Sequence, residues 1–458
     1  MFYLPLSYES CSLNLFKRIR HWPYPIWLDS CRDQNTTGRY DILTAQPQWR
    51  LIHQNNCFYL HQENKISQII EPNLFKIIIE TFNAWCSLYS VDLKSSDEAT
   101  PLPGLFGYLG YKFNHSIEKI ISTKTQDIPL PDAYLGFYPW CLVVDHDKKS
   151  TLLISLLDND STQTIYQQLQ QPLIEPCIEK IAEQDFSLTR AYQANLTQAE
   201  YFSAFNKIKN YLQQGDCYQI NFAQRFQASY VGDPFFAYQR NRQTMPAPYS
   251  AFIQLPEGSI LCHSPEHFIT VNHQQVKTSP IKGTAAKQSD HHLDQQVQKK
   301  LLASEKNRAE NIMIVDLLRN DLGKVCAANS IQVEELCALK TFSHLHHLIS
   351  TVSGTLPSNT SALNLLQACF PGGSITGAPK HRAMQIIDEL EPHRRSVYCG
   401  SIIHFGINQG LNSNITIRTQ VACDHQIYAW AGGGIVADST AEEEYEESFI
   451  KIRPLLIN

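Results

Sequence analysis

The chain has 458 residues, 43% of them hydrophobic and 18% charged, a composition typical of a globular protein with a large core. Its formal net charge of −6 comes without any dense stripe of lysine and arginine, so we expect no nucleic-acid binding. No stretch approaches the roughly 18 consecutive apolar residues of a transmembrane helix, so we expect no membrane span.

The 13 cysteines are scattered singly and include no Cys-x-x-Cys pair. This pattern argues against the usual zinc sites and thioredoxin-type redox sites. The first residues, Met1–Pro5, lack the basic region of a secretion signal. An odd number of cysteines without such a signal indicates free thiols, and we therefore expect a cytoplasmic protein.

The sequence divides into three segments that differ in their patterns of predicted strands, helices and motifs. Residues 1–145 combine short β-like runs such as Tyr40–Thr44 with one predicted helix, Leu74–Leu88. Residues 146–196 predict a strand, a helix and a polar connection. The third segment, residues 197–458, is the largest and contains the motifs that suggest chemistry.

The third segment alternates between helical and strand patterns. Its first helix is predicted over Ala199–Leu212, and strands are predicted over Tyr218–Ala228, Ile260–Val271 and Ser396–Phe405. Because strands and helices interleave throughout, the fold class is α/β or α+β with large sheets.

Lys282 stands in an unusual local sequence, Ser279–Thr284, between a proline-fixed turn and a glycine. Such a setting can present an amine to a cavity, where burial or a neighbouring cation lowers its pKa and makes it nucleophilic. Taken alone, the segment more commonly indicates a surface lysine in a loop.

A helix is predicted to begin after Thr440, because Thr440 and Glu443 have the spacing of a capping box. Glu444 and Glu447 share one face of this helix, and Lys451 lies one turn further along that face. The acidic start simply complements the helix dipole, or it contributes to a site for Mg²⁺, which prefers oxygen ligands.

Two glycine-rich segments precede helices. In Ala431–Val436 three glycines join a predicted strand to the acidic helix, where backbone N–H groups can converge on an anion. The longer loop Phe370–Lys380 opens a helix with Pro379 in its first turn. Its small residues allow a ligand to approach the backbone closely.

A further helix is predicted over Glu305–Leu322. Ile312 and Leu318 belong to its expected core stripe, together with Val315 and Leu322. Glu310 and Asn311 lie off that stripe, so Glu310 either faces solvent or points into a cleft.

Taken together, these segments resemble the chorismate-utilising enzymes, the family that includes anthranilate synthase, isochorismate synthase and aminodeoxychorismate synthase. The resemblance is strong from Thr197 to Pro454 and looser before residue 145. It is carried by Gly215–Asn221, Ser264–Glu266, Ser279–Thr284, Lys306–Asn311, Arg319–Asp321, Pro371–Lys380, Ala431–Val436 and Asp438–Ser448.

The resemblance implies an α+β fold with two large, mainly antiparallel sheets packed in the centre and helices outside. It also implies that residues 197–458 are the chorismate-binding catalytic domain and that residues 146–196 connect it to an N-terminal region, residues 1–145. In relatives that region forms a tryptophan pocket, and this chain matches the region through Ile26–Ser30 and Gly104–Tyr111.

The resemblance also implies roles for individual residues. Lys282 is expected to be the nucleophile that attacks C2 of chorismate, and Glu266 the acid that protonates the leaving C4 hydroxyl. Mg²⁺ is expected on Glu310 and Glu447, with Glu444 in the neighbouring acidic position. The expected substrate-binding residues are Thr284, His347, Tyr398, Arg418, Gly432, Gly434 and Lys451.

A lysine at position 282 resembles the sequence of the family members that aminate chorismate at C4. Anthranilate synthases have a small residue at this position. No Gly-x-Cys-x-Gly nucleophile motif occurs, so ammonia is expected from a separate glutamine amidotransferase subunit or from free ammonium. Where family members often have an arginine, this chain has Ala285-Ala286-Lys287. The alternatives are an anthranilate synthase large component, an isochorismate synthase and a catalytically silent chorismate-binding protein.

Overall fold

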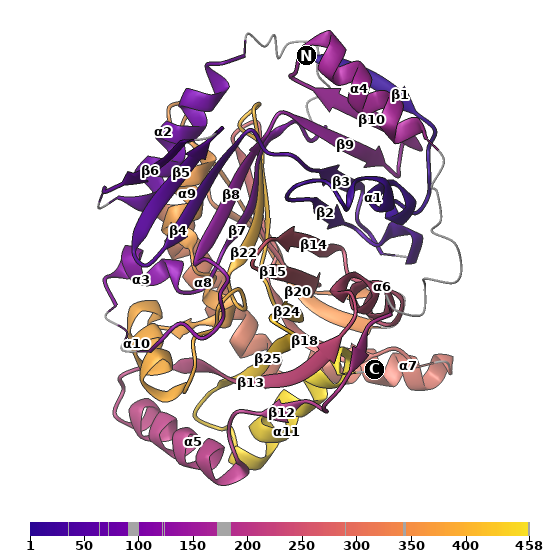
Figure 1. The fold of residues 1–458 in the computed structure, drawn as a ribbon. Helices are drawn as coiled ribbons and strands as arrows, with labels where there is room; N and C mark the ends of the chain where they lie inside the picture. Colours follow the sequence, from indigo (N-terminus) through magenta and orange to yellow (C-terminus); the bar gives the residue numbers. More distant parts are fainter. Residues whose placement is uncertain are drawn as a thin grey trace.

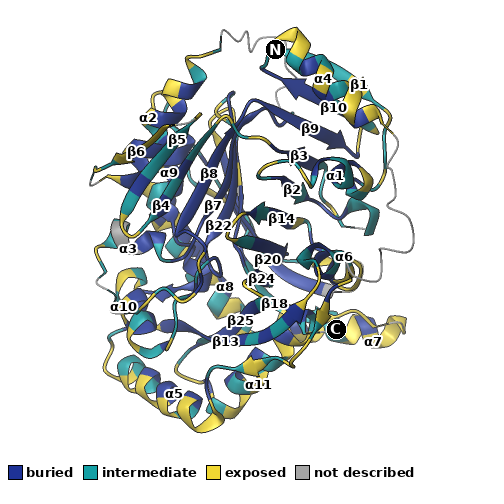
Figure 2. Ribbon diagram, in the orientation of Figure 1, coloured by how far each residue is buried: buried dark blue, intermediate teal, exposed yellow. Residues whose placement is uncertain are grey.

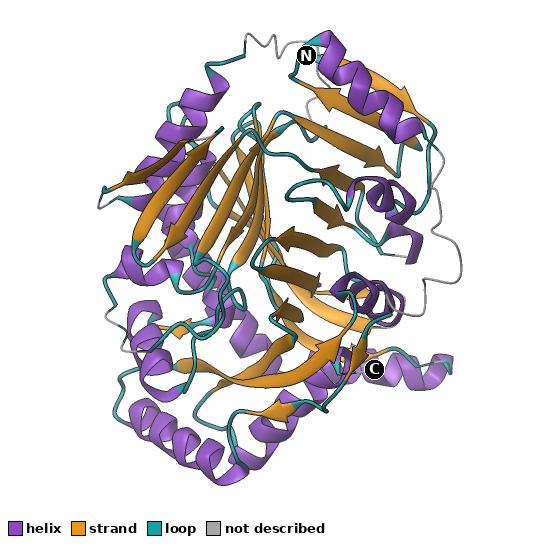
Figure 3. Cartoon of the chain, in the orientation of Figure 1, coloured by secondary structure: helices purple, strands orange, loops and turns teal. Residues whose placement is uncertain are grey.

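The computed structural model describes residues 1–456 except residues 35, 64, 72, 90–99, 121, 123, 172–184, 289 and 342–344. Within these residues the strands form two antiparallel sheets, of 13 and 12 strands, at the centre of the molecule (Figure 1). Helices lie outside the sheets (Figure 3). This arrangement confirms the α+β fold expected from the sequence.

The 13-stranded sheet has strand order β1 (Phe2–Leu6), β10 (Ser150–Ser155), β9 (Trp140–Asp145), β3 (Tyr40–Thr44), β2 (Ile26–Asp29), β14 (Tyr249–Leu255), β15 (Gly258–Ser264), β24 (Thr419–Cys423), β25 (Gln426–Ile435), β13 (Gln219–Val231) and β11 (Ser187–Leu188), with β12 (Gln193–Ala194) and β21 (Gly377–Ala378) also on β13. The 12-stranded sheet has order β18 (Ile281–Ala286), β20 (Leu345–Thr355), β17 (Gln275–Thr278), β16 (His267–Asn272), β23 (Leu411–Asn414), β22 (Ser401–Gly406), β7 (Gly104–Leu109), β8 (Ala133–Tyr138), β4 (Trp49–Gln54), β5 (Cys57–Gln62) and β6 (Lys65–Ile69), with β19 (Gln332–Thr341) also on β20.

The helices are α1 (Leu13–Ile19), α2 (Leu74–Cys86), α3 (Phe113–Glu118), α4 (Asn159–Gln170), α5 (Gln198–Gln213), α6 (Pro234–Thr244), α7 (His291–Ala303), α8 (Glu305–Gly323), α9 (Ala362–Cys369), α10 (Lys380–Leu390) and α11 (Ala441–Ile452), with short 3₁₀ turns at Arg32–Gln34, Gly373–Ile375 and Arg453–Leu455. No helix in the described part of the chain is long and apolar enough to cross a bilayer.

Alternation along the strands builds two hydrophobic cores, because successive side chains of a strand point to opposite faces. In β3, Ile42 joins the large core between the sheets, while Leu43 joins the core under α1 and α4. In β15, Ile260 and Leu261 divide in the same way. Both faces of the central strands are therefore buried (Figure 2).

The N-terminal 145 residues contribute strands to both sheets. Strand β2 pairs with β14, and β7 pairs with β22, so each sheet runs across the two segments of the sequence. The division at residues 145 and 197 describes the order of motifs along the chain and stays a prediction.

Two predicted helices, Leu74–Leu88 and Ala199–Leu212, are confirmed as α2 and α5. Helix α5 is fixed at its start by a reciprocal capping box between Thr197 and Glu200. The predicted strand Ile260–Val271 is wrong as a single element. It is two strands, β15 and β16, that belong to different sheets.

Three other predictions need correction. The strand placed over Ser396–Phe405 begins only at Ser401, because residues 396–400 form a turn. The glycines Gly432–Gly434 lie inside β25 and do not join a strand to a helix. In α8, Ile312 is 42% exposed whereas Asn311 is fully buried, so the core stripe is rotated by about one residue.

Candidate active site

Lys282 is presented by a bulge in the edge strand β18. The register of β18 against β20 shifts between Ile281 and Thr284, and Gly283 between them has φ +88°. A side chain at Gly283 would press on Asn307 of α8. The bulge therefore turns Lys282 out of the regular pleat and toward the centre of the molecule, and its Nζ donates to the backbone oxygen of Ser374 at 3.1 Å.

Burial lowers the pKa of Lys282, although the carboxylates of Glu266, Glu310 and Glu447 act in the opposite direction. Lys451 adds to the lowering. The charged form of an amine loses hydration when buried, so the neutral nucleophilic form becomes more accessible.

Glu266 lies where the chain leaves one sheet and enters the other. It follows β15 of the 13-stranded sheet and precedes β16 of the 12-stranded sheet. Its backbone N–H donates to Ser264 Oγ at 3.1 Å, and its Oε1 accepts a hydrogen bond from Ser374 Oγ at 2.7 Å. Burial raises the pKa of this carboxyl, while Lys282, Ser374 and Lys451 partly offset the rise. A raised pKa suits a general acid.

The loop Pro371–Ala378 brings Ser374 to both residues. Its short 3₁₀ turn packs on α8, since a Cβ on Gly373 would overlap Leu317. Thr376 Oγ1 closes the turn by donating to the carbonyl of Gly372 at 2.9 Å. The sequence indicated a ligand-approach loop here but did not single out Ser374.

The three glycines of β25 make room for polar side chains from neighbouring elements. A Cβ on Gly433 would lie 2.5 Å from Glu444 Oε2, and a Cβ on Gly434 would overlap the amide of Gln219. Lys451 Nζ donates to the carbonyl of Gly432 at 3.0 Å. The anion nest expected between strand and helix is therefore not formed. Instead, the space left by the three glycines is filled by groups of α11 and β13.

Two carboxylates of α11, Glu444 and Glu447, face Gly433 of this strand, and Glu310 of α8 lies close enough for the charge of Glu447 to act on it. Glu444 is 2% exposed; its Oε1 accepts from Ser439 Oγ at 2.7 Å, and its Oε2 has no hydrogen-bond partner in the described part of the chain. Glu447 Oε1 lies 2.5 Å from Lys451 Nζ. Burial raises the pKa of Glu310 and of Glu444, and the charge of Glu447 raises both further.

These donors fit Mg²⁺ in chemistry, because an orphaned buried carboxylate oxygen and mutually repelling acids are what a hard cation relieves. Their spacing is not that of a closed metal cage: among the described residues no three acidic, histidine or cysteine side chains are close enough to hold an ion.

Thr284 and His347 face one another across the β18–β20 ladder, with 2.8 Å between Thr284 Oγ1 and His347 Nδ1. Burial lowers the pKa of His347 to about 4, with a further lowering by Arg418, so the imidazole is neutral at pH 7. Arg418 has φ +49° and forms no side-chain ion pair within the described chain. Its guanidinium is therefore available to an anionic ligand.

Tyr398 lies in the turn before β22, stacked on Trp430 of β25 with 6.0 Å between ring centroids. Gln219 of β13 is fully buried beside Gly434, and its amide N and O have no partner among the described residues. In the sequence, Gln219 stood out only as one member of the motif Gly215–Asn221. Strand β13 carries several other polar residues, so its pattern gave no signal that separates Gln219 from them.

Similarity to known proteins agrees with this geometry. The profile of the family described as chorismate binding enzyme matches residues 42–457. This chain belongs to that family. It is 46% identical over 445 residues to aminodeoxychorismate synthase component 1 of Salmonella typhimurium, covering 97% of this chain and 94% of the relative. The protein of the same name from Escherichia coli is 40% identical, covering 96% and 94%.

Among solved structures, anthranilate synthase component I from Streptococcus pneumoniae superposes with a TM-score of 0.81 at 28% identity, covering 92% of this chain and 93% of that one. This chain therefore shares its overall fold with that anthranilate synthase component.

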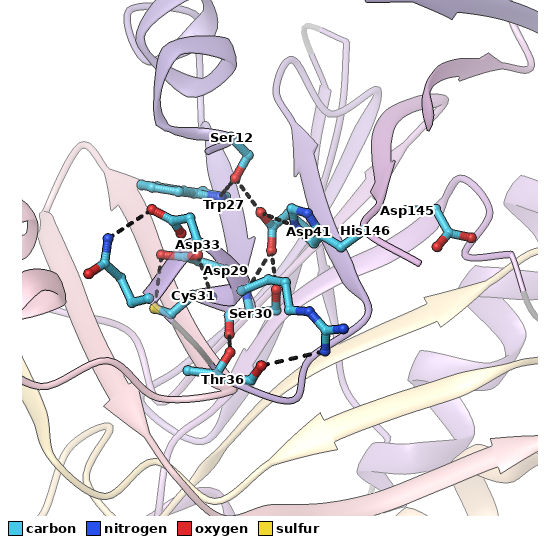
Figure 4. A network of polar contacts seen from close by, with 12 residues as sticks. Ser12, Trp27, Asp29, Ser30, Cys31, Asp33, Thr36, Asp41, Asp145 and His146 are labelled. Atoms are coloured by element: carbon cyan, nitrogen blue, oxygen red, sulfur yellow. Dashed lines mark hydrogen bonds and ion pairs between the residues drawn. The ribbon is translucent and has the colours of Figure 1, made fainter. Parts of the chain in front are cut away.

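The N-terminal segment that resembles a tryptophan pocket has its acidic group engaged internally. Asp29 accepts from Arg242 Nε of α6 at 2.6 Å and from the hydroxyl of Tyr238 at 2.9 Å. Nearby, Asp41 accepts from Ser12 and Ser30 and lies 2.9 Å from His146 Nε2 (Figure 4). A ligand amine would have to compete with Arg242 for Asp29; tryptophan binding here stays a prediction.

Proposed function

We propose that this chain converts chorismate and ammonia to 4-amino-4-deoxychorismate, the precursor of p-aminobenzoate. The observation that carries the proposal is the pairing of a half-buried lysine with a buried carboxyl around Ser374. Relatives that carry the name aminodeoxychorismate synthase component 1 support it.

In the first step Lys282 Nζ forms a bond to C2 of the ring. The two ring double bonds shift toward C4, and the C4 hydroxyl departs as water with the proton of Glu266. Lys282 suits this role because burial lowers its pKa, and Glu266 suits it because burial raises its pKa.

In the second step ammonia forms a bond to C4, the double bonds shift back, and Lys282 leaves C2 as a neutral amine. The carboxylate of Glu266 takes the surplus proton from the new C4 ammonium. The net change is loss of water and gain of one amino group, and the enzyme returns to its starting state. Two displacements at one ring replace a single difficult substitution.

The substrate carboxylates would be held by two sets of groups. Arg418, which has no acidic partner among the described residues, offers a planar guanidinium for the enolpyruvyl carboxylate, and Tyr398 would contribute to the same subsite. The ring carboxylate would lie at the glycine strand near Lys451, where Glu310, Glu444 and Glu447 would hold Mg²⁺. When bound there, Mg²⁺ would neutralise the ring carboxylate and draw charge from the reacting ring.

Ammonia would come from a glutamine amidotransferase subunit or, in its absence, from concentrated ammonium. Product analysis of the purified chain with chorismate, Mg²⁺ and ammonium tests the proposal, with aminodeoxychorismate lyase added in a parallel tube. We expect p-aminobenzoate only in the tube with lyase. Anthranilate and pyruvate without lyase, or isochorismate, would overturn the assignment.

A further inference from the structure

Ser374 makes direct hydrogen bonds with both proposed reacting groups. Its hydroxyl donates to Glu266 Oε1 at 2.7 Å, and its backbone oxygen accepts from Lys282 Nζ at 3.1 Å. The residue is buried and lies in the 3₁₀ turn Gly373–Ile375. One peptide unit with its side chain thus connects the acid with the nucleophile.

The turn that carries Ser374 is held from two sides. Arg395 Nη1 donates to the carbonyl of Ile375 at 2.9 Å, and Arg395 is itself held by two hydrogen bonds to Glu391, of 2.6 and 2.9 Å. The N–H of Asn221 donates to the carbonyl of Thr376 at 2.8 Å. Because all of these groups are buried, Ser374 has little freedom to follow a moving carboxyl.

We propose that Ser374 is a positioning residue that fixes which oxygen of Glu266 carries the transferable proton. The proposal rests on the function proposed above. A hydroxyl that donates to Oε1 leaves Oε2 as the oxygen that is protonated in the acid form. The backbone oxygen of the same residue simultaneously holds the Lys282 amine. The positions of the acid and the nucleophile relative to one another, and to a bound ring, are therefore fixed.

The hydroxyl also acts on the charge of Glu266. A hydrogen bond donated to a carboxylate favours the ionised form, so loss of the hydroxyl raises the pKa of Glu266. The other groups that act on Glu266 are the cations Lys282 of β18 and Lys451 of α11 and the thiol of Cys399. None of these is altered by a substitution at the Ser374 side chain.

The test compares Ser374→Thr with Ser374→Val, two variants of equal shape of which only the first keeps a hydroxyl. The ionisation midpoint of Glu266 is read from its protonated-carboxyl infrared band, assigned by the loss of that band in Glu266→Gln. We expect a midpoint at higher pH in Ser374→Val and near the wild-type value in Ser374→Thr. We also expect kcat to fall about tenfold to a hundredfold in Ser374→Val, with a smaller change in KM.

Thr376→Val is the matched control, since it removes a buried hydroxyl from the same loop that bonds only backbone carbonyls. An unchanged midpoint in Ser374→Val, or an equal shift in Thr376→Val, would overturn the positioning role. If Ser374→Val does not fold, Ser374→Ala supplies the same comparison. The infrared midpoint does not depend on the product formed, so failure of the proposed amination is recognised separately, from the products of the wild-type chain.

Discussion

Glu444 Oε2 lies directly over Gly433, 2.5 Å from the position that a Cβ would occupy, and has no hydrogen-bond partner in the described chain. The position of the buried Glu444 carboxylate thus depends on the absence of a side chain at Gly433. The strand gives up a side chain, and the helix α11 places a buried carboxylate oxygen in the space.

Gly433→Ala should therefore displace Glu444 and weaken Mg²⁺ binding by about tenfold or more, because the orienting contacts of a metal ligand commonly carry that much affinity. Calorimetric titration of Mg²⁺ into the purified chain measures this directly. Gly323→Ala at the end of α8 is the control, as its new Cβ would meet only an ordinary contact at 3.8 Å. Equal affinity in Gly433→Ala and wild type would remove Glu444 from the proposed metal site.

Lys282→Ala should abolish any covalent adduct between the chain and chorismate, because it removes the amine that donates to Ser374 next to Glu266. Intact-protein mass spectrometry after acid quenching, with ammonia omitted, is the measurement. Lys287→Ala, an exposed lysine just beyond β18, should retain the adduct. An adduct that survives Lys282→Ala would place the nucleophile elsewhere.

Much of the site could be predicted because its residues stand in long motifs with local structure of their own. Thr440 caps the N–H of Glu443, so α11 begins where its capping pattern predicts, and Glu444 and Glu447 share a face. The helix α8 was also located correctly. Its face was misjudged because the buried Asn311 bonds the backbone of Leu348 and the side chain of Ser350, a tertiary contact that outweighs the apolar pattern.

Features that depend on contacts between distant segments could not be predicted from the local sequence pattern. The run Ile260–Val271 is apolar enough for one strand, yet the chain changes sheets at Glu266, and this crossing places the carboxyl in the site. The glycines of β25 look like a loop because glycine weakens strands. The strand tolerates three consecutive glycines because the side chains of Gln219 and Glu444 pack against them, which only the structure shows.

Glu266→Gln should abolish amination and yet stabilise the fold at neutral and higher pH. The folded-state pKa of Glu266 is raised above its ordinary value of 4.5, so the wild type loses stability as pH rises from about 4.5 through the folded pKa. The amide carries no such cost. Thermal unfolding at pH 4 and pH 8 should therefore give a stability gain only at pH 8. The exposed Glu257→Gln serves as control, and equal gains at both pH values would mean that ionisation of Glu266 is not the cause.

Arg242→Met should destabilise the protein by about 3–5 kcal/mol, because it leaves Asp29 buried without a cation. Arg242 of α6 bonds both Asp29 and Asp33, and so ties the catalytic segment to the N-terminal strands. Burial already raises the pKa of Asp29 from 3.8, and loss of Arg242 raises it further. The stability deficit of the variant should consequently grow as pH rises above about 3.8 and shrink in acid, as urea unfolding at several pH values will measure. Arg32→Met, which removes a surface pair with Asp147 and a long hydrogen bond to the carbonyl of Thr36, should cost little at any pH. A deficit in Arg242→Met that is independent of pH would show that packing of the side chain, and not its charge, holds the two segments together.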